Sequence, residues 1–353
     1  MKKPIIILLH GMGKYPSGEI VTEFSTAADK LLNQFPKFKT AKISDKAEIK
    51  EINFDAFFDT YRKKMADRSK PIAERLGAAN LAGFPGLVSK LTAIESKYGD
   101  DDFVYTHLLD VFFYTSFLGE KVRLDVAKSF VALLQEFNDR RIYIVAHSLG
   151  TAVIHDTLAK LYRGDFDAYE DAPSLGSLTN RIQSMWMIAN VSKVVNKLSG
   201  ITDPLTSRVR PSGDGCTNKF NNVHHKLDPF TFIDPFEPKD DGSWIPADNY
   251  LYDFLDIETS AIRSWNTHDL SEYIENPRVG VPLLQDLFRD FRPDEEDIND
   301  VTNAFQATTI DGAFDVLKEE LRDMDIKSVA SIKDLSDAIV SFRKVIKNLG
   351  FEE

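Results

Sequence analysis

The stretch that decides the fold covers residues 142–152 and reads IYIVAHSLGTA. Its first part, residues 142–146, is a continuous apolar run, which is typical of a strand buried in a parallel sheet. A helix-compatible run begins directly after Ser148, so the stretch predicts a strand, a tight turn and a helix. A serine on such a turn is held above the end of the strand, at the positive end of the helix dipole. We therefore predict that Ser148 is a nucleophile.

The turn around Ser148 needs small residues two positions before and two positions after the serine, because the chain reverses there within a few atoms. Ala146 and Gly150 meet this requirement. Glycine is usual at both positions, so Ala146 departs from the pattern, although alanine is small enough to fit. A match of this kind is common by chance, and the strand before it and the helix after it make it much more specific.

A second motif stands near the start of the chain, where the apolar run IIILL is followed by HGMG, ending at Gly13. Gly11 and Gly13 allow backbone N–H groups to point into a cavity, which is what a tetrahedral oxyanion requires. We predict that the amides of Met12 and Leu149 are the two donors. We also expect His10 to brace the turn through a hydrogen bond.

The motifs HGMG and AHSLG, in this order, resemble the oxyanion loop and the nucleophile elbow of the α/β-hydrolase superfamily, in particular its serine lipases and esterases. The resemblance covers about residues 1–290 and is more specific for the superfamily than for any family within it. It implies an α/β-hydrolase fold with a mostly parallel central sheet flanked by helices. It also implies that the catalytic residues follow the order serine, then aspartate or glutamate, then histidine.

Of the seven histidines, His268 is the one that lies far enough downstream to satisfy this order comfortably. It stands in a polar loop after residues 257–265, five residues before Tyr273. This His-x-x-x-x-Tyr environment resembles the catalytic-histidine loop of bacterial lipase-like hydrolases. The predicted role of His268 is to accept the Ser148 proton and then to deliver it to the leaving alcohol. The alternative is an ordinary histidine in a surface loop.

The acid has three candidates between the serine and the histidine. Asp228 follows a polar strand at residues 220–225, and its Asp-Pro sequence resembles the acid-bearing turn of the family. Asp203 and Asp234 are also followed by proline and remain competitors. We favour Asp228, whose role would be to fix the imidazole tautomer and to stabilise the imidazolium that forms.

The other histidines have structural explanations. Alternation along the strand turns His147 away from the nucleophile. His155 falls in the helix that follows, and His107 in a helical insertion. His224 and His225 are neighbours on a strand and face opposite ways, so they do not chelate one metal ion together.

The composition excludes several classes of protein. With 43 Lys+Arg against 55 Asp+Glu the chain carries a net charge of −12, which repels phosphate backbones, so we expect no nucleic-acid partner. The 25 Phe, 11 Tyr and 3 Trp are too much apolar surface for a disordered chain. A single cysteine, Cys216, excludes an internal disulfide framework and a cysteine-rich zinc site. We predict neither a metal nor a cofactor.

The first apolar run, residues 5–9, is too short for a secretory signal, and His-Gly follows it in place of a cleavage site. No stretch approaches the roughly 18 apolar residues of a membrane span. We therefore predict a cytoplasmic protein without stable membrane insertion.

Apolar runs alternate with segments of helical period along the chain, which predicts an α/β fold. We predict a catalytic domain over residues 1–292 with a helical cap insertion at 55–117, and a C-terminal helical extension over 293–353 packed on the core. Strands are expected at residues 4–9, 47–54, 142–146, 185–189 and 220–225. The cap contains apolar residues that either line a tunnel or pack in the core, namely Leu81, Phe84, Leu87, Val88 and Leu91.

Together these features predict a serine hydrolase that cleaves carboxylic esters through an acyl-Ser148 intermediate, with fatty-acyl and phospholipid esters among the substrates. The same triad would serve an acyltransferase, a thioesterase or an amidase, because the pocket sets the substrate and the scaffold sets the mechanism. The alternative from another class is a binding protein that keeps the fold without turnover. We disfavour it because candidates for the nucleophile, oxyanion loop, acid and base are all present. The sequence leaves the oligomeric state open.

Overall fold

The structure, a computed structural model, describes residues 2–65, 102–115, 118–166, 174–177, 179–199, 203–228, 230–231, 234–239, 243–264 and 266–310, with residues 70, 74, 337 and 340. Most of the predicted cap and nearly all of the predicted extension beyond residue 310 lie outside the described residues. The apolar set predicted within the cap lies outside them as well.

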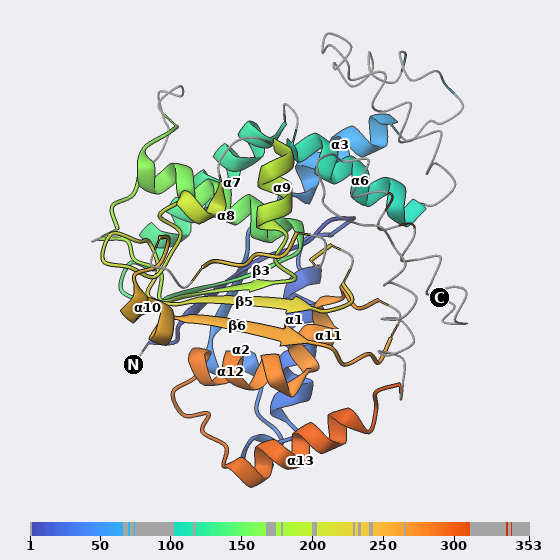
Figure 1. Cartoon of the computed structure of the whole chain (residues 1–353), viewed down its shortest axis with the longest axis vertical. Coiled ribbons are helices and arrows are strands. Elements are labelled where there is room, and N and C mark those ends of the chain that lie inside the picture. The colour runs from blue at the N-terminus through green and yellow to red at the C-terminus, as the bar shows by residue number, and fades with distance from the viewer. Residues whose placement is uncertain are drawn as a thin grey trace.

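The centre of the described fold is a six-stranded sheet in which neighbouring strands run parallel. The strand order is β2-β1-β3-β4-β5-β6 (Figure 1). The strands are β1 (Ile5–Leu9), β2 (Glu48–Glu51), β3 (Ile142–His147), β4 (Ser184–Ile188), β5 (Phe220–His225) and β6 (Phe254–Thr259). The α/β class predicted from the alternating pattern is confirmed.

The central strands are buried on both faces, which is why they read as unbroken apolar runs. β1, β3 and β4 are buried along their whole length. Successive residues of β1 enter two different cores, with Ile5 and Ile7 on one side of the sheet and Ile6 and Leu8 on the other. Because the strands are parallel, their carboxyl ends meet at one edge, where the loops after β1, β3, β5 and β6 gather.

Helices cover both faces of the sheet (Figure 1). One face carries α3 (Asp55–Met65), α6 (Asp102–Thr115), α7 (Gly119–Glu136), α8 (Leu149–Arg163) and α9 (Ser192–Ser199). The other carries α1 (Glu19–Leu32), α2 (Ile43–Lys46), α11 (Leu270–Glu275), α12 (Pro277–Leu287) and, packed on α12, α13 (Glu295–Gln306). Three short helices complete the described set, namely η1 (Pro36–Phe38), η2 (Pro204–Thr206) and α10 (Ala247–Tyr252).

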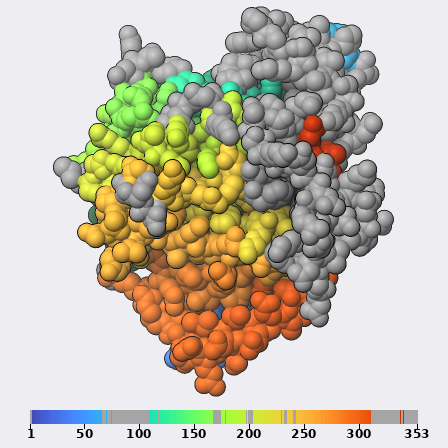
Figure 2. Space-filling model, in the orientation of Figure 1, coloured from blue at the N-terminus to red at the C-terminus, as the bar shows by residue number. Residues whose placement is uncertain are grey.

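The helix α13 lies at the lower end of the molecule, where its outer surface is visible in the space-filling view (Figure 2). It buries Val301 and Phe305 against the body. No helix in the described part of the chain is both long enough and apolar enough to cross a membrane.

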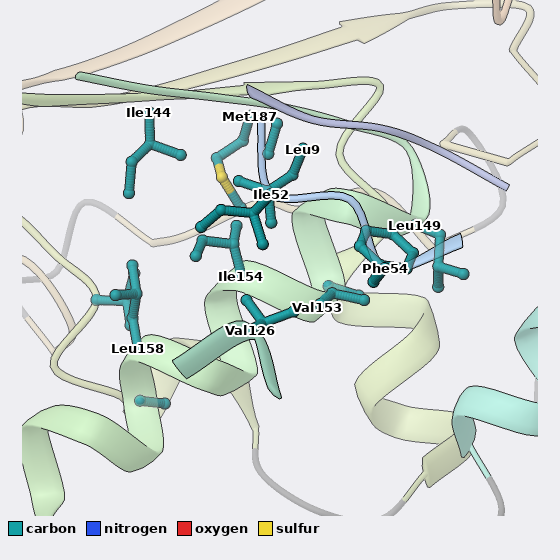
Figure 3. Close-up of a cluster of buried hydrophobic side chains, with 14 of the residues drawn as sticks. Leu9, Ile52, Phe54, Val126, Ile144, Leu149, Val153, Ile154, Leu158 and Met187 are labelled. Atoms are coloured by element: carbon teal, nitrogen blue, oxygen red, sulfur yellow. The ribbon is translucent and has the colours of Figure 1, made fainter. Parts of the chain in front are cut away.

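Apolar packing fixes α8, and with it the turn at its N-terminus, against the sheet. Ile144 and Met187 of the sheet meet Ile154 and Leu158 of α8, with Val126 of α7 beside them (Figure 3). All five side chains are buried. Burying a side chain of this size stabilises a fold by about 1.5–3 kcal/mol, so the position of α8 is strongly determined.

Strand β2 ends at Glu51, three residues before the predicted end at Phe54. The chain leaves the sheet there because its next residues bond to the loop after β1. The Asn53 side-chain amide donates to the carbonyl of Tyr15 (2.9 Å), and the Phe54 amide donates to Nε2 of His10 (3.2 Å).

Strand β6 is absent from the predicted strands, and its second half overlaps the stretch 257–265 that the prediction placed before the His268 loop. It is an edge strand, and its residues Leu255 and Asp256 are exposed. Because Asp256 and Glu258 interrupt its apolar residues, β6 lacks the apolar run by which strands β1, β3 and β4 are found.

Candidate active site

The strand, turn and helix predicted around Ser148 are present. β3 ends at His147 and α8 begins at Leu149, so Ser148 alone forms the turn. Its backbone has φ 52° and ψ −126°, a conformation that costs a residue other than glycine about 1–3 kcal/mol. The Ser148 amide donates to the carbonyl of Ile188 at the end of β4 (3.0 Å), and the Ser148 carbonyl accepts from the hydroxyl of Thr151 (2.6 Å). These bonds hold the strained turn in place.

Neighbouring backbone explains the small residues around this elbow. A Cβ on Gly150 would lie 2.4 Å from the carbonyl oxygen of His10, because β1 passes directly against the start of α8. A Cβ on Gly11 would lie 2.8 Å from the Cβ of Ser148. Ala146 is fully buried in β3, where its methyl group is accommodated.

Ser148, His268 and Asp228 form a hydrogen-bonded row. The Ser148 Oγ lies 2.6 Å from Nε2 of His268, and Nδ1 of His268 lies 2.6 Å from Oδ2 of Asp228. A carboxylate only accepts, so Nδ1 carries the ring proton and Nε2 accepts from the serine hydroxyl. The structure thus brings together the three side chains predicted from motif order, from loops after β3, β5 and β6.

Asp228 is fully buried and receives two further hydrogen bonds. The Phe230 amide donates to its Oδ1 and the Tyr273 hydroxyl donates to its Oδ2, each at 2.9 Å. Burial favours the neutral acid, but the charge and hydrogen bond of His268, with these two donors, hold the pKa of Asp228 below its ordinary value. Asp228 is therefore a carboxylate at neutral pH.

Sequence reasoning missed the roles of Tyr273 and Phe230. Burial, followed by the charge of Asp228, raises the pKa of Tyr273 far above its ordinary value, so its hydroxyl stays a donor. The ring of Phe230 packs against the ring of His268 with centroids 4.5 Å apart. The His-x-x-x-x-Tyr spacing was a signal for Tyr273, whereas no feature of the sequence pointed to Phe230.

The two competing acids have other partners. Asp203 caps the short helix η2 by accepting from the amide of Leu205 (3.0 Å). Asp234 forms an ion pair with Lys193 (3.1 Å). Within the described residues, the carboxylate that bonds to His268 is that of Asp228.

The loop after β1, residues 10–15, faces the elbow from the other side of the nucleophile, and we name it the oxyanion loop. Nε2 of His10 accepts the amide hydrogen of Phe54, so Nδ1 carries the proton and donates to the carbonyl of Gly11 (2.8 Å). Burial lowers the pKa of His10, which keeps this ring neutral. His10 therefore braces the loop by a hydrogen bond, as the sequence predicted.

The backbone amides of the oxyanion loop differ in their partners. The Gly13 amide donates to Oδ2 of Asp110 on α6 (2.8 Å). The amides of Met12 and Leu149 have no hydrogen-bond partner within the described residues, and Leu149 is the first residue of α8, whose amide has no partner inside the helix. Met12 lines the same cleft as Ser148. Among the described residues, these two amides therefore have no competing partner for the oxyanion role that the sequence predicts.

The prediction that alternation turns His147 away from the site is wrong. His147 points to the α1 face of the sheet, and the loop that carries His268 lies on this face. Its Nε2 donates to the backbone carbonyl of His268 (2.8 Å), and the two rings lie 5.2 Å apart. Burial and the repulsion of His268 lower the pKa of His147 to about 3, so His147 stays neutral.

A cleft of about 360 Å³ opens over Ser148 and His268. Its described walls come from the oxyanion loop, from α1 and from residues 266–270. A molecule placed there would contact Ser148, His268 and Met12, which all line the cleft.

The described walls of this cleft carry more acidic than basic side chains. Glu19, Glu23 and Asp269 line it, with Lys14 as a cation at the oxyanion loop. Burial, together with the charges of Asp269 and Glu19, raises the pKa of Glu23 to about 7. The charge of this wall therefore changes near neutral pH.

Metal ligands do not gather in the described part of the chain, which contains no group of three or more His, Cys, Asp or Glu side chains placed to hold an ion. His224 pairs with Asp256 (3.4 Å). His225 instead accepts from the amide of Leu227 (3.0 Å). The two histidines thus serve different local contacts.

Known proteins give no guide to this site. No protein-family model, no curated protein and no solved structure shows a significant match to the chain. The function must therefore be argued from the side chains and amides that surround Ser148.

Proposed function

We propose that this chain is a serine hydrolase of the α/β-hydrolase type that cleaves carboxylic esters through an acyl-Ser148 intermediate. The observation that supports the proposal is the row Ser148–His268–Asp228, in which both hydrogen bonds measure 2.6 Å, at the base of an open cleft. The loops that supply these residues follow β3, β5 and β6, which agrees with the serine, acid, histidine order of the family it resembles.

In the first half of the reaction, the Ser148 Oγ attacks the ester carbonyl carbon while its proton moves to Nε2 of His268. The carbonyl oxygen becomes an oxyanion that accepts from the amides of Met12 and Leu149, and one such donor contributes about 3–4 kcal/mol to the transition state. The Asp228 carboxylate stabilises the imidazolium. When the carbon–oxygen bond breaks, Nε2 gives its proton to the leaving alcohol and the acyl group stays on Ser148.

In the second half, a water molecule replaces the alcohol and the same groups repeat their roles. Nε2 of His268 takes a proton from the water as its oxygen attacks the acyl carbon. The bond to the Ser148 Oγ then breaks, and Nε2 returns its proton to this oxygen. The products are a carboxylic acid and the free serine.

The polar walls of the cleft favour a substrate with a polar group beside the scissile ester. Glu19, Glu23 and Lys14 would contact such a group, whereas a long acyl chain needs an apolar wall. The apolar cap residues, which either line a tunnel or pack in the core, lie outside the described residues. From the charged side chains of the described walls we rank polar and short-chain esters above fatty-acyl and phospholipid esters, and we keep the cytoplasm as the proposed location.

Hydrolysis of p-nitrophenyl esters from acetyl to palmitoyl, with fluorophosphonate labelling, tests the proposal. Ser148→Ala should lose activity by about 10⁴- to 10⁶-fold and should not label. Asp228→Asn should lose about 10⁴-fold, because the amide favours the wrong histidine tautomer. Asp234→Asn is the matched control, since it is also followed by proline but pairs with Lys193, and it should keep normal rates.

Each other outcome has a defined meaning. If Asp234→Asn is the more damaging change, the acid assignment is wrong. If added alcohols speed release of p-nitrophenol and yield new esters, the enzyme is an acyltransferase. If the wild-type protein neither labels nor turns over any ester, thioester or amide, the chain is a binding protein and the proposal fails.

A further inference from the structure

Three charged residues outside the triad form a buried network beside the oxyanion loop. Arg62 lies near the end of α3, and its Nη1 donates to Oδ1 of Asp110 on α6 (2.7 Å). Its Nη2 donates to Oδ1 of Asp55, the first residue of α3. The three side chains are 6%, 1% and 9% exposed in that order. One guanidinium thus joins two carboxylates in the interior.

The second oxygen of each carboxylate binds the backbone of the oxyanion loop. Oδ2 of Asp110 accepts from the Gly13 amide (2.8 Å), and Oδ2 of Asp55 accepts from the Tyr15 amide (3.0 Å). Both carboxylates therefore bridge Arg62 and the loop. The Gly13 bond fixes the peptide group that directly follows Met12, a residue that lines the cleft.

Stability alone does not account for this arrangement. Burying an ion pair costs desolvation that its Coulomb attraction often fails to exceed, and apolar residues of similar size are commonly as stable. The chain holds a comparable cluster on α7 and α8, where Arg123 pairs with Glu120 (3.0 Å) and lies 3.8 Å from Asp156. This cluster also contacts α6, through Tyr114. Within the described residues, that cluster makes no hydrogen bond to the oxyanion loop. What distinguishes the Arg62 network is its contact with two loop amides.

We propose that Asp55, Arg62 and Asp110 are positioning residues that hold the oxyanion loop, so that the direction of the Met12 amide depends on the docking of α3 and α6. This inference rests on the proposed function for its catalytic consequence. Its structural part, that the network protects the Gly13 and Tyr15 amides, stands independently. A displacement of the loop by about 1 Å is enough to cost on the order of a hundredfold in rate.

Two mild variants test the network. Arg62→Lys keeps the charge but replaces the planar guanidinium with a single ammonium group, which cannot donate to both carboxylates with the same geometry. Asp110→Asn keeps the shape but supplies one acceptor where two are used. The matched control is Arg123→Lys, which changes an equally buried arginine in the other cluster. Thermal unfolding establishes that each variant is folded.

Hydrogen exchange of the peptide covering residues 10–16 is the readout that does not require activity. Both test variants should exchange faster at this segment by about tenfold or more, and Arg123→Lys should match the wild-type protein. Unchanged exchange in folded Arg62→Lys and Asp110→Asn would overturn the network as the anchor of the loop.

Kinetics tests the catalytic part. In both test variants kcat should fall about 10- to 100-fold with KM within about twofold, because the lost interaction is made in the transition state. The preference for an oxygen ester over its thiono analogue should shrink as well, since a thiono sulfur does not fit a preformed oxyanion site. Faster exchange with unchanged kcat would overturn the positioning role. A wild-type protein without any hydrolase activity would instead refute the proposed function. The exchange experiment would still decide whether the Arg62 network anchors the oxyanion loop.

Discussion

The two turns that face each other across the nucleophile are held by different means. The elbow at Ser148 is fixed by its own neighbours in sequence, with β3 before it, α8 after it and a carbonyl that accepts from Thr151. One backbone bond to Ile188 ties it to the next strand. The strain of its positive φ is absorbed by a strand and a helix that are buried along their contact with the sheet.

The oxyanion loop is held mainly by residues that are distant from it in sequence. Its carbonyls and amides are bonded by side chains that lie far along the chain, including Asn53, Asp55 and Asp110. The bond between the ring of His10 and the Phe54 amide completes the set. The loop therefore depends on the correct docking of β2, α3 and α6.

The two turns of the site are therefore determined by different parts of the sequence. A turn between a buried strand and a helix is specified by a short stretch of sequence, because its neighbours supply its hydrogen bonds. A loop held by distant side chains is specified only once the fold is complete. Mutations should therefore damage stability and catalysis together at the elbow, and catalysis more than stability at the loop.

Among the variants that test this comparison, Gly150→Ala in the elbow has the largest expected effect. The added methyl group would lie 2.8 Å from the carbonyl oxygen of Leu9, the last residue of β1, and 2.4 Å from that of His10, the first residue of the oxyanion loop. We expect the free energy of unfolding to fall by about 2–3 kcal/mol and kcat to fall about 10²- to 10³-fold. Urea denaturation and ester hydrolysis measure the two losses. If the free energy of unfolding and kcat were both normal, α8 would be free to move against β1, and the elbow would not be the more rigid of the two turns.

The next effect is that of Gly11→Ala in the oxyanion loop. The methyl group would meet the Cβ of Ser148 at 2.8 Å and its Oγ at 3.3 Å. The loop, held by side chains, should shift to relieve the contact, so we expect kcat to fall about a hundredfold and stability to fall by at most about 1 kcal/mol. A stability loss as large as that of Gly150→Ala would mean that the loop is as rigid as the elbow.

The sequence was sufficient for the elements whose signals are local. Central strands β1, β3 and β4 and the helix α8 were predictable because burial on both faces leaves unbroken apolar runs. Edge strand β6 was missed because Asp256 and Glu258 interrupt its apolar residues. The end of β2 was misplaced because Asn53 and Phe54 leave the sheet to bond the oxyanion loop, a contact between segments that no periodicity reveals.

The site shows the same division. Ser148, Asp228 and His268 could be selected because a family order relates them along the chain. Asp55, Arg62 and Asp110 had no such rule, and a charged residue in a helix gives no sign that it will be buried against a distant loop. The contact of His147 with the His268 carbonyl was mispredicted because alternation gives the face of a strand but not which loop covers it.

A smaller effect is expected for Tyr273→Phe, which removes a long-range donor to Asp228 on the acid side of the site. We expect kcat to fall about three- to tenfold, because the bonds from His268 and Phe230 remain. Tyr273 is among the groups that keep the pKa of Asp228 low. Its removal raises that pKa, so the loss of activity on acidification should begin at a higher pH than in the wild-type protein.

The matched control for this variant is Tyr162→Phe. Tyr162 is also buried, and its hydroxyl donates to the carbonyl of Asn180. It stands near the C-terminal end of α8, whereas Ser148 precedes the N-terminal end of this helix. Rates and the acidic limb of the pH profile should be those of the wild-type protein. An equal shift of the acidic limb in both variants would mean that general destabilisation causes it. Tyr273 would then not act through its hydrogen bond to Asp228.

The smallest expected effect tests the acidic wall of the cleft, next to the oxyanion loop. Glu23 has a raised pKa of about 7, so its carboxylate becomes charged as the pH rises from 6 to 8. The KM of an anionic ester, such as a p-nitrophenyl hemisuccinate, should therefore rise about two- to fivefold over this interval, and that of a neutral ester of the same size should not. Glu23→Gln should remove the pH dependence, whereas Glu295→Gln, an exposed change on α13, should preserve it. If Glu23→Gln keeps the wild-type pH dependence of KM, the titrating group is not Glu23. The oxyanion side of the cleft would then stabilise the transition state without selecting substrates by their charge.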